Sequence, residues 1–331
     1  MANRYTQVHQ SPAGAGDARP TAQQIIQDER LEGQWSGKVI LITGCSSGLG
    51  VRTARALYTT GATLYLTARD LNKARLALHD LIDSPRVYLL HLDLNSLASV
   101  RACAEQFKTQ STRLNILIAN AGVMGCPEGR TADGFETQFG TNHLAHFHLF
   151  HLLRPALIAS STPTFHSRVI ILSSGSHRFG QVNFDNLTWQ GEYDTWMAYA
   201  QSKTANIWTA NEIERRYGSQ GLHAVSLHPG TIATDLLRHV PDEQMAVWTA
   251  DKDLEKYWKT PEQGAATIVW AATAKELEGR GGVYLDNCSV AEEWVPTESG
   301  WGSGYASWAF SPEKEARLWD VSLELVGLKG E

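Results

Sequence analysis

Residues 39–50 of the chain read VILITGCSSGLG, and this stretch decides the fold. Its first four residues are all apolar, which is typical of a strand buried on both faces of a parallel sheet. Glycines follow at positions 44, 48 and 50, and a helical pattern of apolar residues begins at Val51. Glycines at a strand-to-helix turn let the backbone approach a pyrophosphate, and the helix N-terminus offers free N–H groups to that anion. The stretch therefore predicts a dinucleotide-binding turn.

The same alternation of short apolar runs and helical stretches continues along the chain. Strands that alternate with helices form a parallel sheet with helices on both faces. We therefore expect an α/β protein with a single Rossmann-fold domain, whose doubly wound, seven-stranded parallel sheet has the order 3-2-1-4-5-6-7. The predicted strands are Lys38–Thr43, Thr63–Thr67, Arg86–His91, Asn115–Ala119, Ser167–Ser173, Leu222–His228 and Gly282–Leu285.

Three regions of the chain are expected. Residues 1–36 form an N-terminal extension, in which residues 1–20 are rich in Gly, Ala, Ser and Pro, a composition typical of disorder. A short helix over Thr21–Gly33 follows, with Ile25, Ile26 and Leu31 on one side. Residues 37–290 form the Rossmann-type domain, with a small, mobile helical substrate cap at about 235–260, and residues 291–331 add an aromatic-rich loop and a helix.

The composition argues against several classes of protein. The net charge is −6 and no run of basic residues occurs, so a nucleic-acid partner is not expected. The apolar runs are too short to cross a bilayer and the four cysteines lie far apart, which predicts a cytoplasmic protein without a membrane span. We expect no metal, because the crowded histidines lack a carboxylate or cysteine at matching spacing. These histidines are His143, His146, His148 and His151.

The glycine stretch has a second interpretation. Residues 44–48 also match G-x-S-x-G, the turn that carries the nucleophile of α/β-hydrolases. That turn normally follows several strands and needs an acid and then a histidine downstream. Here it follows the first strand, which favours the dinucleotide loop.

The end of the second predicted strand carries the signal for the type of cofactor. At this place an acid binds the ribose hydroxyl of NAD, whereas an arginine pairs with the additional phosphate of NADP. Arg69 comes first, Asp70 follows, and Lys73 lies where it can face the same way. We favour NADP(H), although Asp70 is compatible with NAD.

Tyr199 and Lys203 are four residues apart and therefore lie on one face of a helix. A tyrosine with an ordinary pKa is a poor proton donor at neutral pH, and a nearby ammonium is expected to lower that pKa. This pair becomes specific only alongside Ser174 upstream and the glycine loop.

Together these motifs resemble the short-chain dehydrogenase/reductase family, over roughly residues 37–285. The long spacer between Ser174 and Tyr199 is similar to the branch of retinol dehydrogenases and the WW-domain oxidoreductase, and residues 67–70 look like those of NADPH-using carbonyl reductases. The motifs that carry the resemblance contain Thr43, Gly44, Gly48, Gly50, Asp93, Leu94, Asn120, Ala121, Gly122, Asn142, Ser173, Ser174, Tyr199, Lys203, Pro229 and Gly230.

The resemblance implies a catalytic role for four residues. Tyr199 would be the general acid or base, and Ser174 would hold the substrate oxygen. Lys203 would bind the nicotinamide ribose and lower the pKa of the tyrosine, while Asn142 would fix a water in a proton relay. With the glycine loop and the basic pair, the expected cofactor contacts are Gly44, Ser46, Ser47, Gly48, Leu49, Gly50, Arg69, Lys73, Asp93, Leu94, Asn120, Ala121, Gly122, Tyr199, Lys203, Pro229, Gly230, Ile232 and Thr234.

The expected activity is reversible hydride transfer between NADP(H) and a carbonyl or secondary alcohol. The chain is rich in tryptophan, so a bulky or apolar small-molecule substrate is expected to contact Trp196 and Trp248. The alternatives are an NADPH-binding sensor or scaffold without catalysis, and a lyase or cyclase built on the same fold. The resemblance also implies a homodimer through the helices that carry Asn142 and Tyr199, unless the long spacer obstructs that contact.

Overall fold

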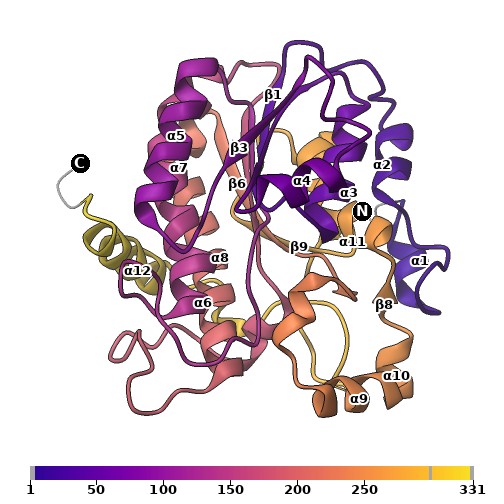
Figure 1. Cartoon of the computed structure of the whole chain (residues 1–331). Coiled ribbons are helices and arrows are strands. Elements are labelled where there is room, and N and C mark those ends of the chain that lie inside the picture. Colours follow the sequence, from indigo (N-terminus) through magenta and orange to yellow (C-terminus); the bar gives the residue numbers. More distant parts are fainter. Residues whose placement is uncertain (1–3, 298–299, 329–331) are drawn as a thin grey trace.

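A mostly parallel sheet lies at the centre of the computed structural model, which describes residues 4–297 and 300–328 (Figure 1). The seven expected strands pair in the expected parallel order, but the strand count is wrong because an eighth strand, β10, pairs antiparallel with the edge strand β9. The prediction missed β10 because it has only two residues. The strands are β1 (Val39–Ile42), β2 (Thr63–Ala68), β3 (Val87–His91), β4 (Ile116–Ala119), β5 (Ser167–Leu172), β6 (Leu222–His228), β9 (Val283–Asp286) and β10 (Ser289–Val290).

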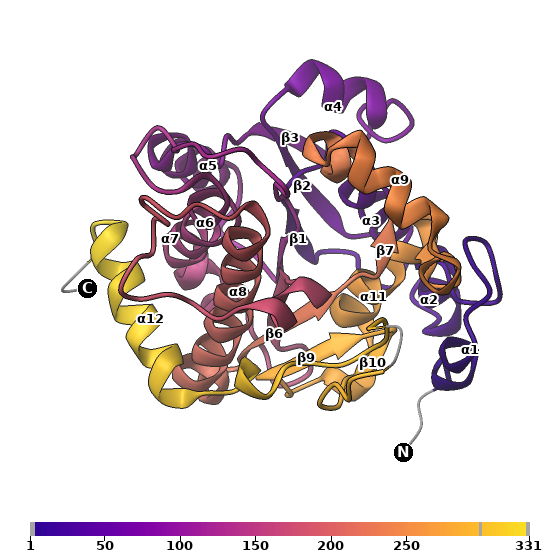
Figure 2. The same ribbon diagram turned by 90° about the horizontal axis from the view of Figure 1, so that it is seen from below.

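Helices cover both faces of the sheet, as Figure 2 shows. Buried side chains form two separate cores, one on each face of the sheet. Alternate residues of β1 enter opposite cores: Ile40 and Ile42 pack on one side, Val39 and Leu41 on the other. The first face carries α2 (Ala22–Asp28), α3 (Gly48–Tyr58), α4 (Leu71–Ala77) and α11 (Pro261–Thr273), and the second carries α5 (Leu97–Gln110), α7 (Ala145–Ser160), α8 (Thr195–Tyr217) and α12 (Pro312–Leu325).

The N-terminal extension is ordered from residue 4 onward, and the expectation of disorder over residues 1–20 is wrong for this part; residues 1–3 lie outside the described residues. It forms α1 (Thr6–Gln10) and then α2, whose Ile25 and Ile26 are fully buried as the pattern predicted. Composition misled because the segment gains its order from hydrogen bonds to distant residues, among them Gln263.

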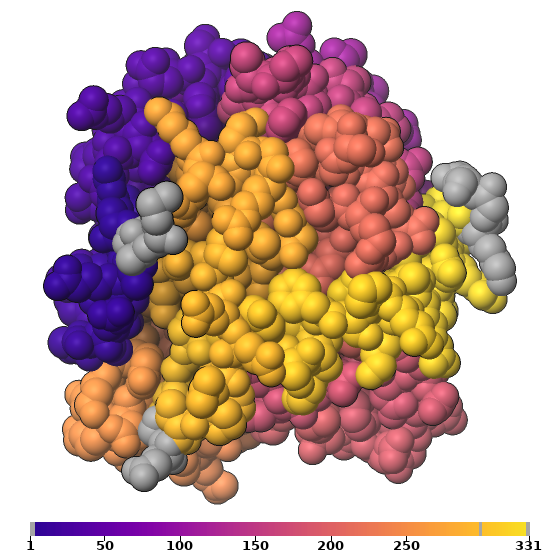
Figure 3. Space-filling model, turned by 180° about the vertical axis from the view of Figure 1, so that it is seen from behind, coloured from indigo at the N-terminus to yellow at the C-terminus, as the bar shows by residue number. Residues whose placement is uncertain are grey.

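The C-terminal segment crosses one face of the molecule as a continuous band, visible in yellow in Figure 3. Its helix α12 packs on α8, and the Trp319 ring contacts Phe147 of α7 at a centroid distance of 5.0 Å. Arg216 of α8 lies over the same indole. These are the helices through which the resemblance implied a homodimer, so α12 covers part of the surface that such pairing would need.

The region 235–260 forms the expected helical cap beside the carboxyl ends of the strands. It consists of a short 3₁₀ turn (Asp235–His239), α9 (Asp242–Ala250), α10 (Lys252–Glu255) and β8 (Trp258–Lys259), which pairs with β7 (Thr231–Ile232). Within residues 4–297 and 300–328, no helix combines the length and apolar character needed to cross a membrane.

Candidate active site

A cavity of about 550 Å³ opens at the carboxyl ends of the parallel strands. Loops at the ends of β1, β2, β4, β5 and β6 line it, and the cap contributes a further wall. Ligands of open α/β sheets bind at this edge. Every residue expected to contact the cofactor lines the cavity except Gly50, and Ser174 and Trp248 line it as well, whereas Asn142 and Trp196 do not.

The glycine loop brings the backbone to the floor of the cavity without side chains in the way. Gly44 has a φ of +76°, and a Cβ on Gly50 would lie only 2.3 Å from the carbonyl oxygen of Gly44. The side-chain amide of Asn120 donates to the Thr43 carbonyl at 2.7 Å, which fixes this loop to the loop after β4. Ser47 precedes α3 but does not cap it with its side chain. The helix start and the loop thus form a cradle that fits a pyrophosphate.

Cys45, inside this loop, is fully buried. Burial raises the pKa of its thiol to about 12, which keeps it protonated. The residue therefore fills space beneath the loop.

The basic pair at the other end of the cavity has two different environments. Arg69 is exposed and has no hydrogen-bond or ion-pair partner in residues 4–297 and 300–328. The carboxylate of Asp70 caps α4 by accepting the N–H of Lys73 at 2.9 Å. The Lys73 ammonium pairs with Asp235 of the cap at 2.5 Å. Three charged residues were expected near the adenosine end of the cofactor. Among the described residues Arg69 is free, while Asp70 and Lys73 are each bonded to another group of the protein.

Tyr199 and Lys203 lie one turn apart on α8, which begins where the Asp194 carboxylate accepts the N–H groups of residues 196 and 197. Both are nearly fully buried, and the Lys203 ammonium lies 5.5 Å from the centroid of the Tyr199 ring. The Ser174 hydroxyl lies close enough to Tyr199 to lower the pKa of that tyrosine, and it donates a hydrogen bond to the Ser176 hydroxyl at 3.3 Å. The neighbouring Ser173 instead donates to the Lys203 carbonyl at 2.8 Å, so it supports the helix and only Ser174 is placed beside the tyrosine.

Burial dominates the electrostatics of this pair. It raises the pKa of Tyr199 to about 12, and the nearby Ser174 hydroxyl opposes that shift. It also lowers the pKa of Lys203 to about 7, because a buried ammonium has lost its hydration. The lysine is itself only partly charged at neutral pH, and the lowering of the Tyr199 pKa by Lys203 stays a prediction.

Asn142 lies behind the cavity wall, in a π-helical turn (Gly140–Leu144) that leads into α7. Its side-chain amide bonds both the N–H and the carbonyl of Val123, at 2.8 and 2.9 Å, and donates to the Ser202 hydroxyl at 3.0 Å. These contacts hold the loop after β4 against α8. In this geometry Asn142 positions the backbone around the site.

The two tryptophans expected at the substrate occupy different layers. Trp248 of α9 lines the cavity, whereas Trp196 packs edge-on behind it with ring centroids 5.6 Å apart. The direct contact expected for Trp196 is therefore not what the structure shows. Trp196 lies at the start of α8, where it contacts the cap and does not line the cavity. Spacing in the sequence could not predict this.

Several cavity residues were missed by sequence reasoning. The N-terminal extension contributes His9 and Arg19. Two basic side chains also reach it, Arg178 from the 3₁₀ turn after β5 and Lys259 from β8. No sequence motif predicts these residues, because each lies in a segment that has no fixed spacing to the glycine loop or to Tyr199.

The crowded histidines have partners that account for most of them. His143 bonds the Ser322 hydroxyl of α12 at 2.9 Å, and His146 bonds Thr43 Oγ1 at the same distance. His151 donates from Nδ1 to a carbonyl one turn earlier. In the described part of the chain, no group of three or more His, Cys, Asp or Glu side chains is arranged to hold a metal.

Comparison with known proteins gives consistent matches. The family model described as short chain dehydrogenase matches residues 38–245. The chain is 49% identical to the short-chain dehydrogenase/reductase prx1 of Penicillium roqueforti over 325 residues, covering 98% of this chain and 95% of that one. It is 38% identical to human retinol dehydrogenase 11, covering 89% and 87%. Among solved structures, an uncharacterised protein from Mycobacterium paratuberculosis matches with a TM-score of 0.67 and 29% identity, covering 95% of this chain and 98% of that one.

Proposed function

Because the chain belongs to the short-chain dehydrogenase family, whose members are oxidoreductases that use a nicotinamide cofactor, we propose a specific activity for it. It is an NADP(H)-dependent oxidoreductase that transfers a hydride between NADPH and the carbonyl or secondary alcohol of a bulky or apolar small molecule. Tyr199 is the general acid in reduction and the general base in oxidation.

The residues along the cavity fit the cofactor. The cradle of Gly44, Gly48 and Gly50 leaves room for the pyrophosphate, since a Cβ on Gly50 would collide with the loop itself. Arg69 would bind the additional phosphate of NADP, because its guanidinium is free among the described residues and Asp70 is engaged in capping α4. Pro229, Gly230, Ile232 and Thr234 also line the cavity and would hold the nicotinamide. When bound, the cofactor supplies the hydride.

The chain's own groups handle the substrate oxygen and its proton. The Ser174 hydroxyl holds the oxygen beside Tyr199, whose pKa it lowers. Tyr199 gives its proton to that oxygen as the carbonyl is reduced. Lys203 would hold the ribose of the cofactor, and a water near Asn142 would return a proton toward Lys203. Nearly complete burial of Tyr199 and Lys203 excludes bulk water from these steps.

The substrate end of the cavity supports a bulky or apolar substrate. Trp248, Tyr257, Trp258 and Trp301 line it from the cap and the C-terminal segment. Aromatic side chains supply a large apolar surface together with a polar edge. The relative at 38% identity is a retinol dehydrogenase, and retinol is a bulky apolar alcohol.

A single observation carries the proposal: Ser174 and Tyr199 both line the cavity, close enough for the Ser174 hydroxyl to lower the pKa of Tyr199, with the Lys203 ammonium beside the same ring. The test is to measure NADPH consumption by the purified protein against a panel of aromatic and aliphatic carbonyls, with NADH in parallel. Consumption of NADPH that matches alcohol formed, with NADH much less effective, is the expected result. NADPH binding without turnover would indicate a sensor, and product formed without NADPH turnover would indicate a lyase or cyclase.

A further inference from the structure

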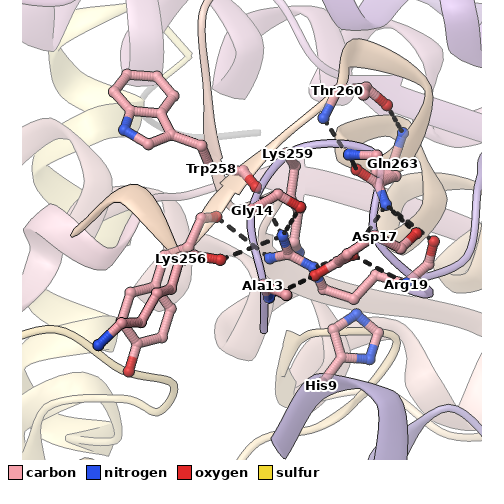
Figure 4. Close-up of polar contacts among 12 residues, drawn as sticks. His9, Ala13, Gly14, Asp17, Arg19, Lys256, Trp258, Lys259, Thr260 and Gln263 are labelled. Atoms are coloured by element: carbon pink, nitrogen blue, oxygen red, sulfur yellow. Dashed lines mark hydrogen bonds and ion pairs between the residues drawn. The ribbon is translucent and has the colours of Figure 1, made fainter. Parts of the chain in front are cut away.

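The N-terminal extension and the cap meet at the substrate end of the cavity, although more than two hundred residues separate them in the sequence. Figure 4 shows the contact, in which Arg19 lies among polar groups of residues 14–17 and 256–263, with His9 close by. The side chain of Arg19 is only 3% exposed. A buried guanidinium is costly unless its donors are satisfied, so its partners define what the contact does.

Arg19 uses its donors almost entirely on backbone carbonyls. Its Nε donates to Asp17 at 2.8 Å. Its two terminal nitrogens donate to the carbonyl oxygens of Lys256 at 3.3 Å, Tyr257 at 3.3 Å and Trp258 at 2.6 Å, and to that of Gly14 at 2.9 Å. Three consecutive carbonyls of the cap are thus fixed by one side chain. The planar fork of arginine has five N–H donors spread over three nitrogens, whereas a lysine has three donors on a single nitrogen.

A second set of bonds fixes the same junction from the other side. Gln263 of α11 donates to the carbonyls of Asp17 and Arg19, at 3.1 and 3.0 Å, and accepts the Gly16 N–H at 2.9 Å. The Gly14 N–H donates to the Lys256 carbonyl at 3.0 Å. The segment 14–19 is therefore held against α11 while it holds residues 256–258.

The fixed stretch forms one wall of the cavity. Tyr257, Trp258 and Lys259 all line it, and the Lys259 ammonium donates to the Pro229 carbonyl at 3.3 Å and to Asn287 at 2.9 Å. His9 lines the same end and is tied to the Tyr5 carbonyl through Nδ1. Arg19 does not touch Tyr199, Ser174 or Lys203, so it acts on the position of the wall and leaves the reacting groups unaffected.

We infer that the N-terminal extension forms part of the substrate pocket. Arg19 is a positioning residue, which fixes the position of the wall formed by Tyr257, Trp258 and Lys259. The inference rests on the proposed function, because it assigns a substrate-selecting role to this wall. A flat, bulky carbonyl compound fills the cavity up to the wall and depends on its position. A small carbonyl compound reaches Tyr199 without touching it.

The test compares Arg19→Ala, Arg19→Lys and the matched control Arg4→Ala in the full chain. Arg4 lies in the same extension but is exposed, and its ion pair with Asp28 lies at the surface. Three quantities are measured: hydrogen exchange of the backbone amides in residues 252–263, the Kd of phenanthrenequinone from quenching of tryptophan fluorescence, and KM and kcat for phenanthrenequinone and for diacetyl with NADPH. Thermal unfolding checks that each variant is folded.

In Arg19→Ala we expect faster exchange in residues 252–263 and a rise of about tenfold in Kd and KM for the quinone. The kcat for diacetyl stays within about twofold, because the reacting groups are distant. Arg19→Lys recovers part of the quinone affinity, and Arg4→Ala resembles the wild type. If Arg19→Ala does not fold, the same comparison is made with Arg19→Lys, which keeps the buried cation and loses the fork.

Two results would overturn the inference. Unchanged exchange would show that Arg19 does not hold the wall. Faster exchange with unchanged quinone Kd and KM would make Arg19 a purely structural residue. A wild type that binds the quinone and NADPH but reduces neither carbonyl would contradict the proposed function alone, and the quinone Kd would then still decide the role of Arg19.

Discussion

Replacing Arg69 by alanine is expected to remove the preference for NADPH without harming the fold. Arg69 follows the last residue of β2, is exposed, lines the cavity and has no partner in residues 4–297 and 300–328, so its loss breaks no interaction within the protein. Asp70 keeps capping α4, because that bond uses its own carboxylate. A hydrogen bond to a charged group contributes about 1.5–3 kcal/mol. The Kd for NADPH should therefore rise by about 10- to 150-fold.

The assay is a fluorescence titration of wild type and Arg69→Ala with NADPH and, separately, with NADH. The Kd for NADH should change by no more than about twofold, because NADH has no phosphate for Arg69 to bind. Arg75→Ala is the control, since Arg75 is exposed on the nearby helix α4 and does not line the cavity. Lys73→Ala should lose less than Arg69→Ala, because Asp235 already holds the Lys73 ammonium. Equal losses for both cofactors, or no loss for NADPH, would refute the assignment of Arg69.

Three further changes test other parts of the site. Gly50→Ala would place a Cβ 2.3 Å from the Gly44 carbonyl, so urea denaturation should show a loss of about 1–3 kcal/mol, and titration should show weakened NADPH binding; unchanged values would contradict the tight loop. Lys203→Met should abolish turnover and flatten the pH dependence of stability. In the wild type, burial lowers the pKa of Lys203 to about 7, so above that pH the unfolded chain binds more protons than the folded chain. The free energy of unfolding of the wild type therefore rises from neutral pH to about pH 9, and the variant should lack this rise. An unchanged slope in urea denaturation would count against this. Trp248→Ala should raise KM for phenanthrenequinone by about tenfold and KM for diacetyl little. Trp196→Ala should have a smaller effect, because Trp196 lies behind Trp248. Equal effects of the two variants would contradict the placement of Trp196 behind Trp248.

Local sequence signals predicted the sheet and the floor of the cavity. The four apolar residues from Val39 to Ile42 are buried as a strand that lies between two cores must be. Gly44, Gly48 and Gly50 occupy positions where a side chain is strained or collides, so their spacing carries the geometry directly. Tyr199 and Lys203 share a helix, and four residues of spacing suffice to bring them together.

The walls of the cavity could not be predicted in the same way. Arg19 and Lys259 become neighbours of the site only through tertiary contacts, and neither belongs to a periodic pattern. The raised pKa of Tyr199 also escaped the sequence, because it comes from burial, which depends on how deeply α8 is packed. The role of Asn142 stays a prediction; its amide is engaged by Val123 and Ser202, which no spacing reveals.

The most direct test of the central claim is the single-turnover rate of hydride transfer in Tyr199→Phe, with NADPH and the carbonyl compound both saturating. Phenylalanine fills the same buried space but cannot donate a proton. We predict a rate lower by about 10²- to 10⁴-fold, with the Kd for NADPH within about threefold of the wild type. A rate within about threefold of the wild type, with the cofactor bound equally well, would contradict Tyr199 as the proton donor and with it the proposed mechanism.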